Sequence, residues 1–223
     1  IREAYGLELE YLRDADSGQS WSATYEPLRV KPDSFEARMG LGYTTIASKN
    51  FDIATDVTYF VPRSDSCECW IVKITNTGKT ARTLNLFSYI EWFIGSTDYI
   101  NFYNIAILWN RMDFDKDTQS VQARKTAFYE EFNIKNNQYI AFISSSEKVD
   151  GWDANKANFL GRLNTESEPQ GVVKGQCTQS LCDGEEGVGV LQHNITLKPG
   201  ETKTIVFTLG QAVGKEAAAE LIE

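Results

Sequence analysis

The sequence predicts an all-β domain, a large antiparallel β-sandwich with a helix at its C-terminal end. Short runs rich in β-branched and aromatic residues recur along the chain and are separated by clusters of Gly, Pro, Asn, Asp and Ser, the pattern of a two-sheet fold. Hydrophobic residues make up 42% of the 223 residues, enough to fill the core of one large domain. No repeat, linker or low-complexity segment interrupts the chain, so we predict a single domain.

The N-terminal part of the chain is predicted to form strands. Leu7–Leu12 alternates apolar and polar residues, as a half-buried strand does. This strand is expected to end at Arg13–Gly18, where Asp, Ser and Gly favour a turn. Phe51–Phe60 is rich in β-branched and aromatic residues and is closed by Pro62, which predicts another strand.

The middle of the chain is predicted to contain a β-hairpin and a short helix. Cys69–Thr75 and Leu84–Trp92 are β-rich runs on either side of the Gly-containing turn Asn76–Thr80, so the two strands are expected to pair. A helix is expected over Asp153–Phe159 with Asp153 as N-cap, because an Asp side chain accepts hydrogen bonds from first-turn amides. Two further strands are expected near Val121–Tyr129 and Tyr139–Ile143.

The C-terminal part predicts a second hairpin and a helix. Val190–Leu197 and Thr202–Leu209 flank Lys198–Glu201, whose Pro at the second position and Gly at the third fit a type II turn. Lys215–Glu223 is rich in Ala and Glu and predicts a helix. Because the chain opens at Ile1 and closes in this helix, we expect it to be a piece of a longer polypeptide.

Composition excludes some classes of partner and favours another. The net charge of −9 argues against a nucleic-acid partner, which requires a basic surface. No apolar run is long enough to span a bilayer. Aromatic residues reach 12%, with five Trp and ten Tyr. Rings at exposed positions can stack on the apolar face of a pyranose, although β-rich proteins also use many aromatics in their cores.

The cysteines and the single histidine offer little for a catalytic or metal site. The chain has four cysteines (Cys67, Cys69, Cys177 and Cys182), fewer than the disulfide framework of a small secreted domain would have, so we expect reduced thiols and a cytoplasmic protein. Their C-x-C and C-x4-C spacings match zinc sites poorly, so we expect no metal. A Ser–His–Asp or Cys–His site would have to use His193, which lies in a predicted strand beside no nucleophile motif.

Two other motifs are better explained as loops. Asp113–Asp117 resembles the start of a calcium loop, but the sixth and twelfth positions are Thr118 and Arg124 instead of Gly and Glu. Gly184–Gly189 has no following Lys-Ser/Thr to make a phosphate-binding loop. Spacing alone selects no pair of carboxylates for glycosidic-bond chemistry, so no catalytic residue is predicted.

Six segments, taken in order along the chain, form a recognisable set. They are Tyr11–Gly18 with Trp21, Ser22 and Pro27; Phe35–Thr44; Thr58–Pro62; Phe87–Trp92; Val149–Trp152 with Phe159–Gly161; and Leu197–Thr202. In their order and spacing, from about Tyr11 to Gly210, they resemble the N-terminal domain of glycoside hydrolase family 94, the cellobiose phosphorylase family. Ala37 and Met39 depart from the family, which often carries Cys and His there, so no role is assigned to these two positions.

The resemblance implies a galactose-mutarotase-like supersandwich over residues 1–212, and the start of a helical linker to an absent (α/α)6 barrel over 213–223. It also implies that the parent protein is an inverting phosphorylase. Such an enzyme cleaves a β-linked di- or oligosaccharide with inorganic phosphate as co-substrate, needs no other cofactor, and yields an α-sugar 1-phosphate. The barrel would hold the catalytic residues, so this chain alone would be inactive and would serve assembly, homodimerisation and enclosure of the active site.

Five residues are candidates for contacting sugar or lining an active-site wall. They are Arg13, Asp14, Trp21, Arg38 and Tyr43, because Arg and Asp beside aromatic rings suit hydroxyl recognition and stacking. The alternative is that Arg13 and Asp14 fix a turn and that Trp21 fills the core.

Two other function classes remain open. The domain could be an independent carbohydrate-binding module that uses a row of exposed rings drawn from Trp21, Trp92, Trp109 and Trp152. It could also be a structural dimerisation unit that never contacts sugar.

Overall fold

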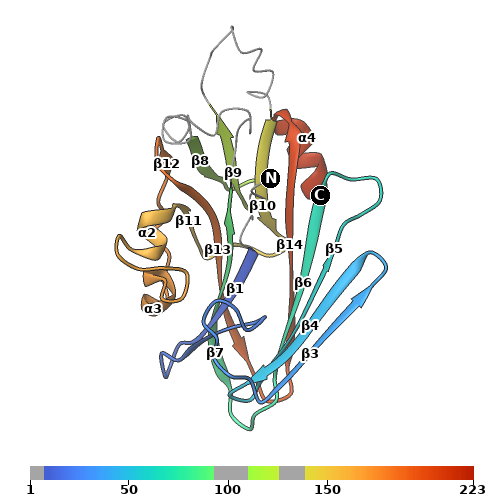
Figure 1. The fold of residues 1–223 in the computed structure, drawn as a ribbon, viewed down its shortest axis with the longest axis vertical. Coiled ribbons are helices and arrows are strands. Elements are labelled where there is room, and N and C mark those ends of the chain that lie inside the picture. The colour runs from blue at the N-terminus through green and yellow to red at the C-terminus, as the bar shows by residue number, and fades with distance from the viewer. Residues whose placement is uncertain (1–7, 93–109, 126–138) are drawn as a thin grey trace, which may run out of the picture.

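The structure is a computed structural model that describes residues 8–92, 110–125 and 139–223 (Figure 1). Antiparallel strands make up most of it, as predicted. The strands are β1 (Glu8–Asp14), β2 (Ser20–Ser22), β3 (Ser34–Gly40), β4 (Tyr43–Asn50), β5 (Ile53–Phe60), β6 (Cys67–Asn76), β7 (Arg82–Glu91), β8 (Asn110–Asp115), β9 (Ser120–Lys125), β10 (Tyr139–Ser145), β11 (Gly151–Asn155), β12 (Cys182–Asp183), β13 (Gly187–Leu197) and β14 (Thr202–Val213). The helices are α2 (Lys156–Leu160), α3 (Gln170–Lys174) and α4 (Gly214–Ile222).

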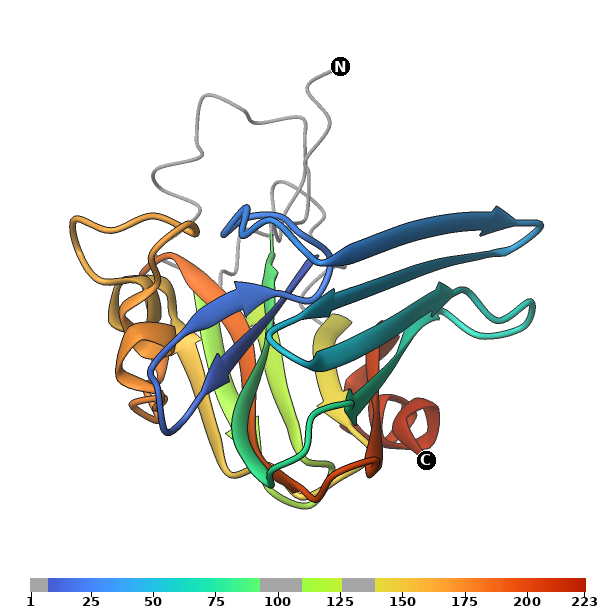
Figure 2. The ribbon, with the colours of Figure 1, turned by 90° about the horizontal axis from the view of Figure 1, so that it is seen from below.

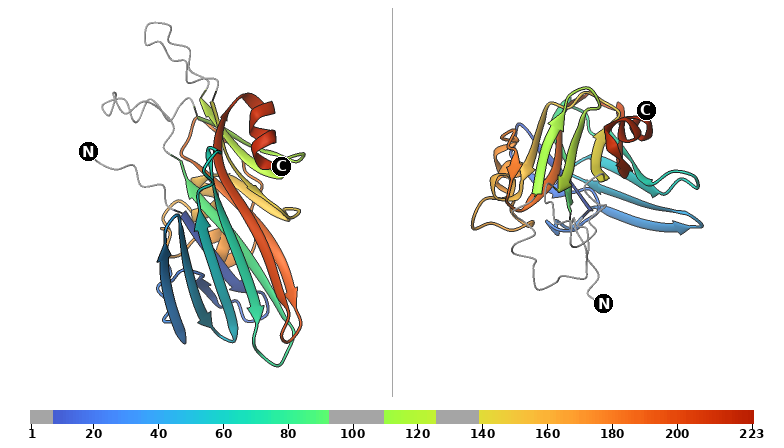
Figure 3. Two further views of the ribbon diagram at one scale, coloured as in Figure 1. Left: turned by 90° about the vertical axis from the view of Figure 1, so that its right-hand side faces the viewer. Right: turned by 90° about the horizontal axis from the view of Figure 1, so that it is seen from above.

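The described strands form two sheets that pack face to face (Figure 3). The smaller has five strands in the order β11-β13-β7-β1-β2, and the larger has nine in the order β12-β8-β9-β10-β14-β6-β5-β4-β3. The predicted β-sandwich is therefore confirmed. The sheets differ in width, so part of the larger sheet extends beyond the smaller one, and this difference shapes the candidate site.

Side chains from the facing sides of the two sheets form the core. In β5 and β6, alternate residues are buried, which places one face of each strand against the other sheet. Trp70 and Phe207 lie directly opposite each other on β6 and β14, with ring centroids 6.3 Å apart. Leu12 and Leu86 come from the smaller sheet and belong to the same buried cluster. The apolar run of β7 is buried along both of its faces.

Both predicted hairpins are wrong, because each turn carries the chain from one sheet to the other. β6 pairs with β5 and β14 in the larger sheet, whereas β7 pairs with β1 and β13 in the smaller one. In the same way β13 and β14 lie in different sheets. The predicted turn at Lys198–Glu201 has the expected local geometry, with a Glu201 N–H to Lys198 oxygen bond of 3.0 Å and φ of +77° at Gly200.

Asn76 joins these two inter-sheet turns. Its side-chain amide donates to the carbonyl oxygens of Thr80 at 2.8 Å and Leu197 at 3.0 Å. Its backbone carbonyl accepts from Gly200 at 2.8 Å. Because Asn76 is fully buried, these bonds satisfy polar groups that would otherwise be costly to bury. The two connections thus close the same end of the sandwich.

The helices cover the outer faces of the two sheets (Figure 1). Phe159 of α2 and Val172 of α3 pack with Tyr11 and Tyr89 on the outside of the smaller sheet. The predicted helix over Asp153–Phe159 begins later than expected, because Asp153 lies in β11 and Asn155 caps α2 by accepting from Asn158 N. Asp153 is instead fully buried and accepts hydrogen bonds from Thr178 and Ser180.

The predicted C-terminal helix is present as α4, which packs against β10 and β14 on the outside of the larger sheet. The strand predicted at Tyr139–Ile143 is confirmed as β10. The strand predicted near Val121–Tyr129 begins with β9, and its last four residues lie outside the described residues. None of the described helices combines the length and the apolar character needed to cross a membrane.

Candidate functional site

The hairpin of β3 and β4 extends beyond the rest of the sandwich (Figure 2). It is the edge of the larger sheet, and every residue of β3 is exposed. Large apolar side chains at and near its tip are also exposed, with Met39 86% and Leu41 fully accessible. A projecting hairpin with exposed apolar side chains is typical of a surface that contacts another protein surface.

Arg38 and Tyr43 lie together on the outer face of this hairpin. Arg38 pairs with Thr45 in the register, and Tyr43 lies two residues before Thr45 on the same face. Arg38 forms a two-pronged ion pair with Glu36, with Nε–Oε1 and Nη2–Oε2 distances of 2.9 and 3.0 Å. The Tyr43 ring lies over Gly40, so closely that a Cβ added at this glycine would clash with the ring. Both predicted residues are therefore exposed and available to a ligand or partner.

Asp14 fixes a turn and does not face solvent. It is 2% exposed, and its Oδ1 accepts from the backbone of Asp16 and Ser17 and from the Ser17 hydroxyl. Oδ2 is held by Arg82. Burial alone would raise the pKa of Asp14, but the bonds from Ser17 and Arg82 outweigh it and hold this pKa below its usual value.

Trp21 is a core residue, with no exposed surface and its ring packed edge-on against Phe51 at 5.5 Å. Neither Asp14 nor Trp21 therefore presents a surface to a sugar in this structure, and both match the alternative expected from the sequence, since Asp14 anchors a turn and Trp21 fills the core. Arg13 is half-buried on the outer face of the smaller sheet, where its Nη1 donates to Asn85 at 3.2 Å. Because Arg38 lies on the outer face of the other sheet, the five predicted residues do not form one site.

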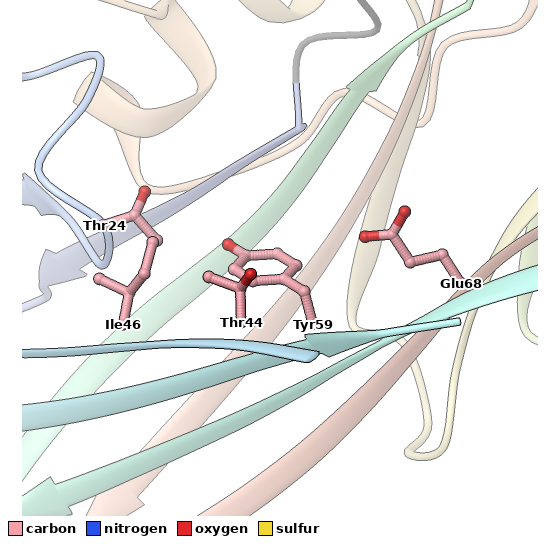
Figure 4. Close-up of a pocket in the computed structure, with 5 residues that line it drawn as sticks. All are labelled: Thr24, Thr44, Ile46, Tyr59 and Glu68. Atoms are coloured by element: carbon pink, nitrogen blue, oxygen red, sulfur yellow. The ribbon is translucent and has the colours of Figure 1, made fainter. Parts of the chain in front are cut away.

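An open pocket of about 350 Å³ lies on the inner face of the larger sheet, next to the loop that follows β2, the edge strand of the smaller sheet (Figure 4). Three neighbouring strands, β4, β5 and β6, contribute Thr44, Tyr59 and Glu68, and Ile46 adds an apolar side chain from β4. The remaining lining residue, Thr24, comes from the loop after β2. This loop is held on the sheet because the Ala23 carbonyl accepts hydrogen bonds from the hydroxyls of Ser48 and Thr55.

The positions of the polar groups in the pocket are fixed by contacts beneath it. Tyr59 donates through its hydroxyl to both carboxylate oxygens of the buried Glu10, each at 2.8 Å, which ties the two sheets together. Glu68 Oε1 accepts from the indole N–H of Trp70 at 3.0 Å. Thr44 lies opposite Tyr59 in the register. No sequence pattern predicts this pocket, because its lining residues come from four separate segments with no common motif.

The row of exposed rings expected for a carbohydrate-binding module is not found among the described residues. Trp21 is buried, and Trp92 is half-buried and packs on the core. Trp152 is also half-buried and stacks on Phe114, with centroids 5.3 Å apart and planes 12° from parallel. Trp109 lies outside the described residues.

The motifs interpreted as loops or core features have structural roles. His193 is buried, and its Nε2 lies 2.9 Å from the Ser145 hydroxyl oxygen. Asp113 is bound by Arg124, the residue that replaces Glu in the calcium pattern, at 2.6 Å. All four cysteines are free. Within residues 8–92, 110–125 and 139–223, no cluster of three or more His, Cys, Asp and Glu side chains suits a metal ion.

Comparison with known proteins identifies related domains. Solabiose phosphorylase of Paenibacillus borealis is 31% identical over 211 residues, which cover 95% of this chain and 27% of that protein. The 3-O-beta-D-glucopyranosyl-beta-D-glucuronide phosphorylase of the same species is 29% identical over 215 residues, again covering 95% and 27%. This chain thus spans about a quarter of the length of either relative.

Comparison of folds gives a consistent result. A bacterial glucoamylase solved in complex with acarbose aligns with a TM-score of 0.61 at 10% identity, covering 96% of this chain and 28% of that one. At that identity the likeness concerns the fold alone. The family model described as "Glycosyl hydrolase 94, supersandwich domain" matches residues 5–223. Since the match extends over nearly all of the sequence, the chain belongs to the glycosyl hydrolase 94 supersandwich domains.

Proposed function

We propose that this chain is the N-terminal, non-catalytic domain of an inverting β-glucoside phosphorylase. The parent enzyme would cleave a β-linked di- or oligosaccharide with inorganic phosphate and release an α-sugar 1-phosphate. The observation that carries the proposal is the family match over residues 5–223, combined with a span of only 27% of two disaccharide phosphorylases. We also propose a cytoplasmic location, which the four free thiols support.

Phosphorolysis would depend on a further domain, for which we propose an (α/α)6 barrel reached through α4. Attack by phosphate needs an acid at the glycosidic oxygen and cationic groups around the phosphate. The described residues that line the pocket on β4–β6 include no Lys or Arg. Leu221 and Ile222 near the end of α4 are only half-buried, and they pack against the small apolar cluster of Phe142, Ala212 and Ala218. This partial burial suits a helix that leads into a linker from about residue 213.

The role proposed for the domain itself is assembly: homodimerisation and enclosure of the active site. The projecting β3–β4 hairpin supports this role, because Met39 and Leu41 expose apolar surface that a second subunit would remove from water. Arg38 and Tyr43 lie on the same hairpin and are proposed to line the wall of the enclosed site.

Comparing the 223-residue chain with its full-length parent tests whether phosphorolysis requires a domain beyond this chain. Both proteins are assayed for phosphate-dependent release of sugar 1-phosphate from β-linked disaccharides. We expect turnover from the parent and none from the chain alone. Phosphorolysis by the isolated chain would contradict the proposal.

Sedimentation of hairpin variants in the full-length parent tests the assembly role. Met39→Asp combined with Leu41→Asp should shift the parent from dimer to monomer, because the variant places charge in a buried interface. Leu163→Asp is the matched control, since Leu163 is 97% exposed in the loop after α2 and lies away from the hairpin. A dimer that survives the hairpin variant would rule out this interface.

A further inference from the structure

We propose that the pocket on the inner face of β4–β6 is a binding site for one neutral pyranose unit. The pocket is lined by Thr24, Thr44, Ile46, Tyr59 and Glu68 (Figure 4). Its volume of about 350 Å³ lies at the lower end of the range of small-molecule sites. The inference does not depend on the activity of the parent enzyme, because it concerns side chains that this chain supplies by itself.

Three polar side chains that line the pocket, those of Thr24, Thr44 and Glu68, can form hydrogen bonds with a ligand. Glu68 is half-buried, and one of its carboxylate oxygens, Oε1, is used by Trp70. Within the part of the chain that the structure describes, its other carboxylate oxygen, Oε2, forms no hydrogen bond, so it can accept from hydroxyl groups of a ligand. The half-buried hydroxyls of Thr24 and Thr44 line the same space, and each can donate one bond and accept others. A ligand with several adjacent hydroxyl groups satisfies this set of donors and acceptors.

The apolar part of the lining suits the C–H face of a sugar ring. The Tyr59 ring is held from below, because its hydroxyl is bound by Glu10 at 2.8 Å and its edge packs against Trp70 at 6.0 Å between centroids. It cannot turn away without breaking the contact between the sheets. Ile46 lies two residues from Thr44 on the same face of β4. Aromatic and aliphatic surface beside oriented hydroxyls is the usual combination for pyranose recognition.

Charge distinguishes a neutral sugar from a sugar phosphate. Among the described residues, the lining contains one carboxylate, Glu68, and no basic side chain. A phosphate group in the pocket would be repelled by Glu68 and would find no cation to bind. The ligand class is therefore an uncharged pyranoside, and a sugar 1-phosphate is disfavoured.

Calorimetric titration of the 223-residue chain tests this site, with methyl β-glucoside, cellobiose and α-glucose 1-phosphate as probes. We expect saturable binding of the two neutral sugars and at least tenfold weaker binding of the phosphate ester. The indole N–H resonance of Trp70 should shift on binding, because Trp70 donates to Glu68.

Paired variants locate the binding site. Thr44→Val should weaken binding about fivefold, and Glu68→Gln about tenfold or more, by removing a neutral and a charged acceptor respectively. Gln retains an oxygen for Trp70, so Glu68→Gln should fold. Thr45→Val is the matched control, because Thr45 is the next residue on β4 and lies on the opposite face, opposite Thr58. Its binding should equal that of the unmodified chain.

Three results would contradict the proposal that this pocket binds a pyranose. They are the absence of saturable binding by both neutral sugars, equal losses in Thr44→Val and Thr45→Val, and binding of α-glucose 1-phosphate as tight as that of methyl β-glucoside. None of these bears on whether the parent is a phosphorylase, and failure of the phosphorolysis assay leaves the titration unaffected. The two proposals can therefore fail separately.

Discussion

Arg82 forms an ion pair with Asp14 in which two guanidinium nitrogens, Nε and Nη2, lie 2.7 and 2.6 Å from the same carboxylate oxygen. The third nitrogen, Nη1, donates to the carbonyl oxygen of Phe51 at 2.9 Å. Asp14 ends β1 and Arg82 begins β7 in the smaller sheet, whereas Phe51 lies in the β4–β5 turn of the larger one. One guanidinium thus connects the turn after β1 to the opposite sheet.

Removing this carboxylate should destabilise the fold. Asp14→Ala leaves Arg82 without its anion and frees the amides of Asp16 and Ser17, so we expect the free energy of unfolding to fall by about 3 kcal/mol. Urea denaturation followed by circular dichroism measures the change. Glu26→Ala, which breaks an exposed ion pair with Arg29, is the control and should have no measurable effect. Equal effects of the two substitutions would contradict the structural role of Asp14.

The core position of Trp21 predicts a large loss of stability on truncation. Trp21→Ala should lower the free energy of unfolding by about 3–5 kcal/mol, because it removes a fully buried ring and leaves a cavity next to Phe51. Tyr43→Ala should change it by less than about 1 kcal/mol, since Tyr43 is 50% exposed. The same urea experiment compares the two variants. A small effect of Trp21→Ala would favour the surface role expected from the sequence.

The all-β class and most individual strands could be predicted from local patterns, but strand pairing could not. The turns at Asn76–Thr80 and Lys198–Glu201 contain the residues of hairpin turns, and the second has the predicted geometry. Turn residues fix the local backbone angles, and they do not decide whether the next strand stays in its sheet. That choice depends on burial, and β7 and β13, buried along much of both faces, lie next to each other in the smaller sheet.

The pocket could not be predicted from the sequence for the same reason, because its residues meet only through strand pairing. Thr44 and Tyr59 are 15 positions apart in sequence and directly opposite each other in the sheet. Glu68 joins them only because β6 pairs with β5. By contrast, the segment from Arg13 to Trp21 carries charges and a ring in one contiguous motif that a sequence shows directly. In the structure, however, Asp14 anchors a turn and Trp21 fills the core.

The Cys67 thiol should react slowly with alkylating agents at neutral pH. Burial first, and the neighbouring Cys69 second, raise the pKa of Cys67 to about 11, so the thiolate that reacts is scarce. The rate of iodoacetamide labelling at Cys67, followed by mass spectrometry of peptides, should rise about tenfold per pH unit from pH 8 to pH 10. Cys177 is buried with a pKa raised well above its usual value, so it should label only after unfolding. A labelling rate at Cys67 that levels off near pH 8.5 would contradict this prediction.

His193 should make the domain less stable in mildly acidic solution. Burial lowers the pKa of this side chain, and it does so against the opposing charges of Asp150 and Glu147. The unfolded chain therefore takes up the proton first as the pH falls, near the ordinary value of about 6.5. The contribution of His193 to stability is fully present above that pH and is lost as the pH falls toward the lower pKa of the folded state, at no more than about 1.4 kcal/mol per pH unit.

Because His193 is the only histidine in the sequence, a single substitution isolates its effect on the pH dependence. His193→Gln keeps a polar side chain beside the Ser145 hydroxyl but does not titrate. We expect the unfolding free energy of the variant, measured in urea from pH 7.5 to pH 5.5, to depend less on pH than that of the unmodified chain. Carboxylates elsewhere contribute equally to both proteins, so the difference between the two curves belongs to His193. Parallel curves would mean that the imidazole has the same pKa in the folded and unfolded states, and would contradict the assignment of a buried, neutral His193.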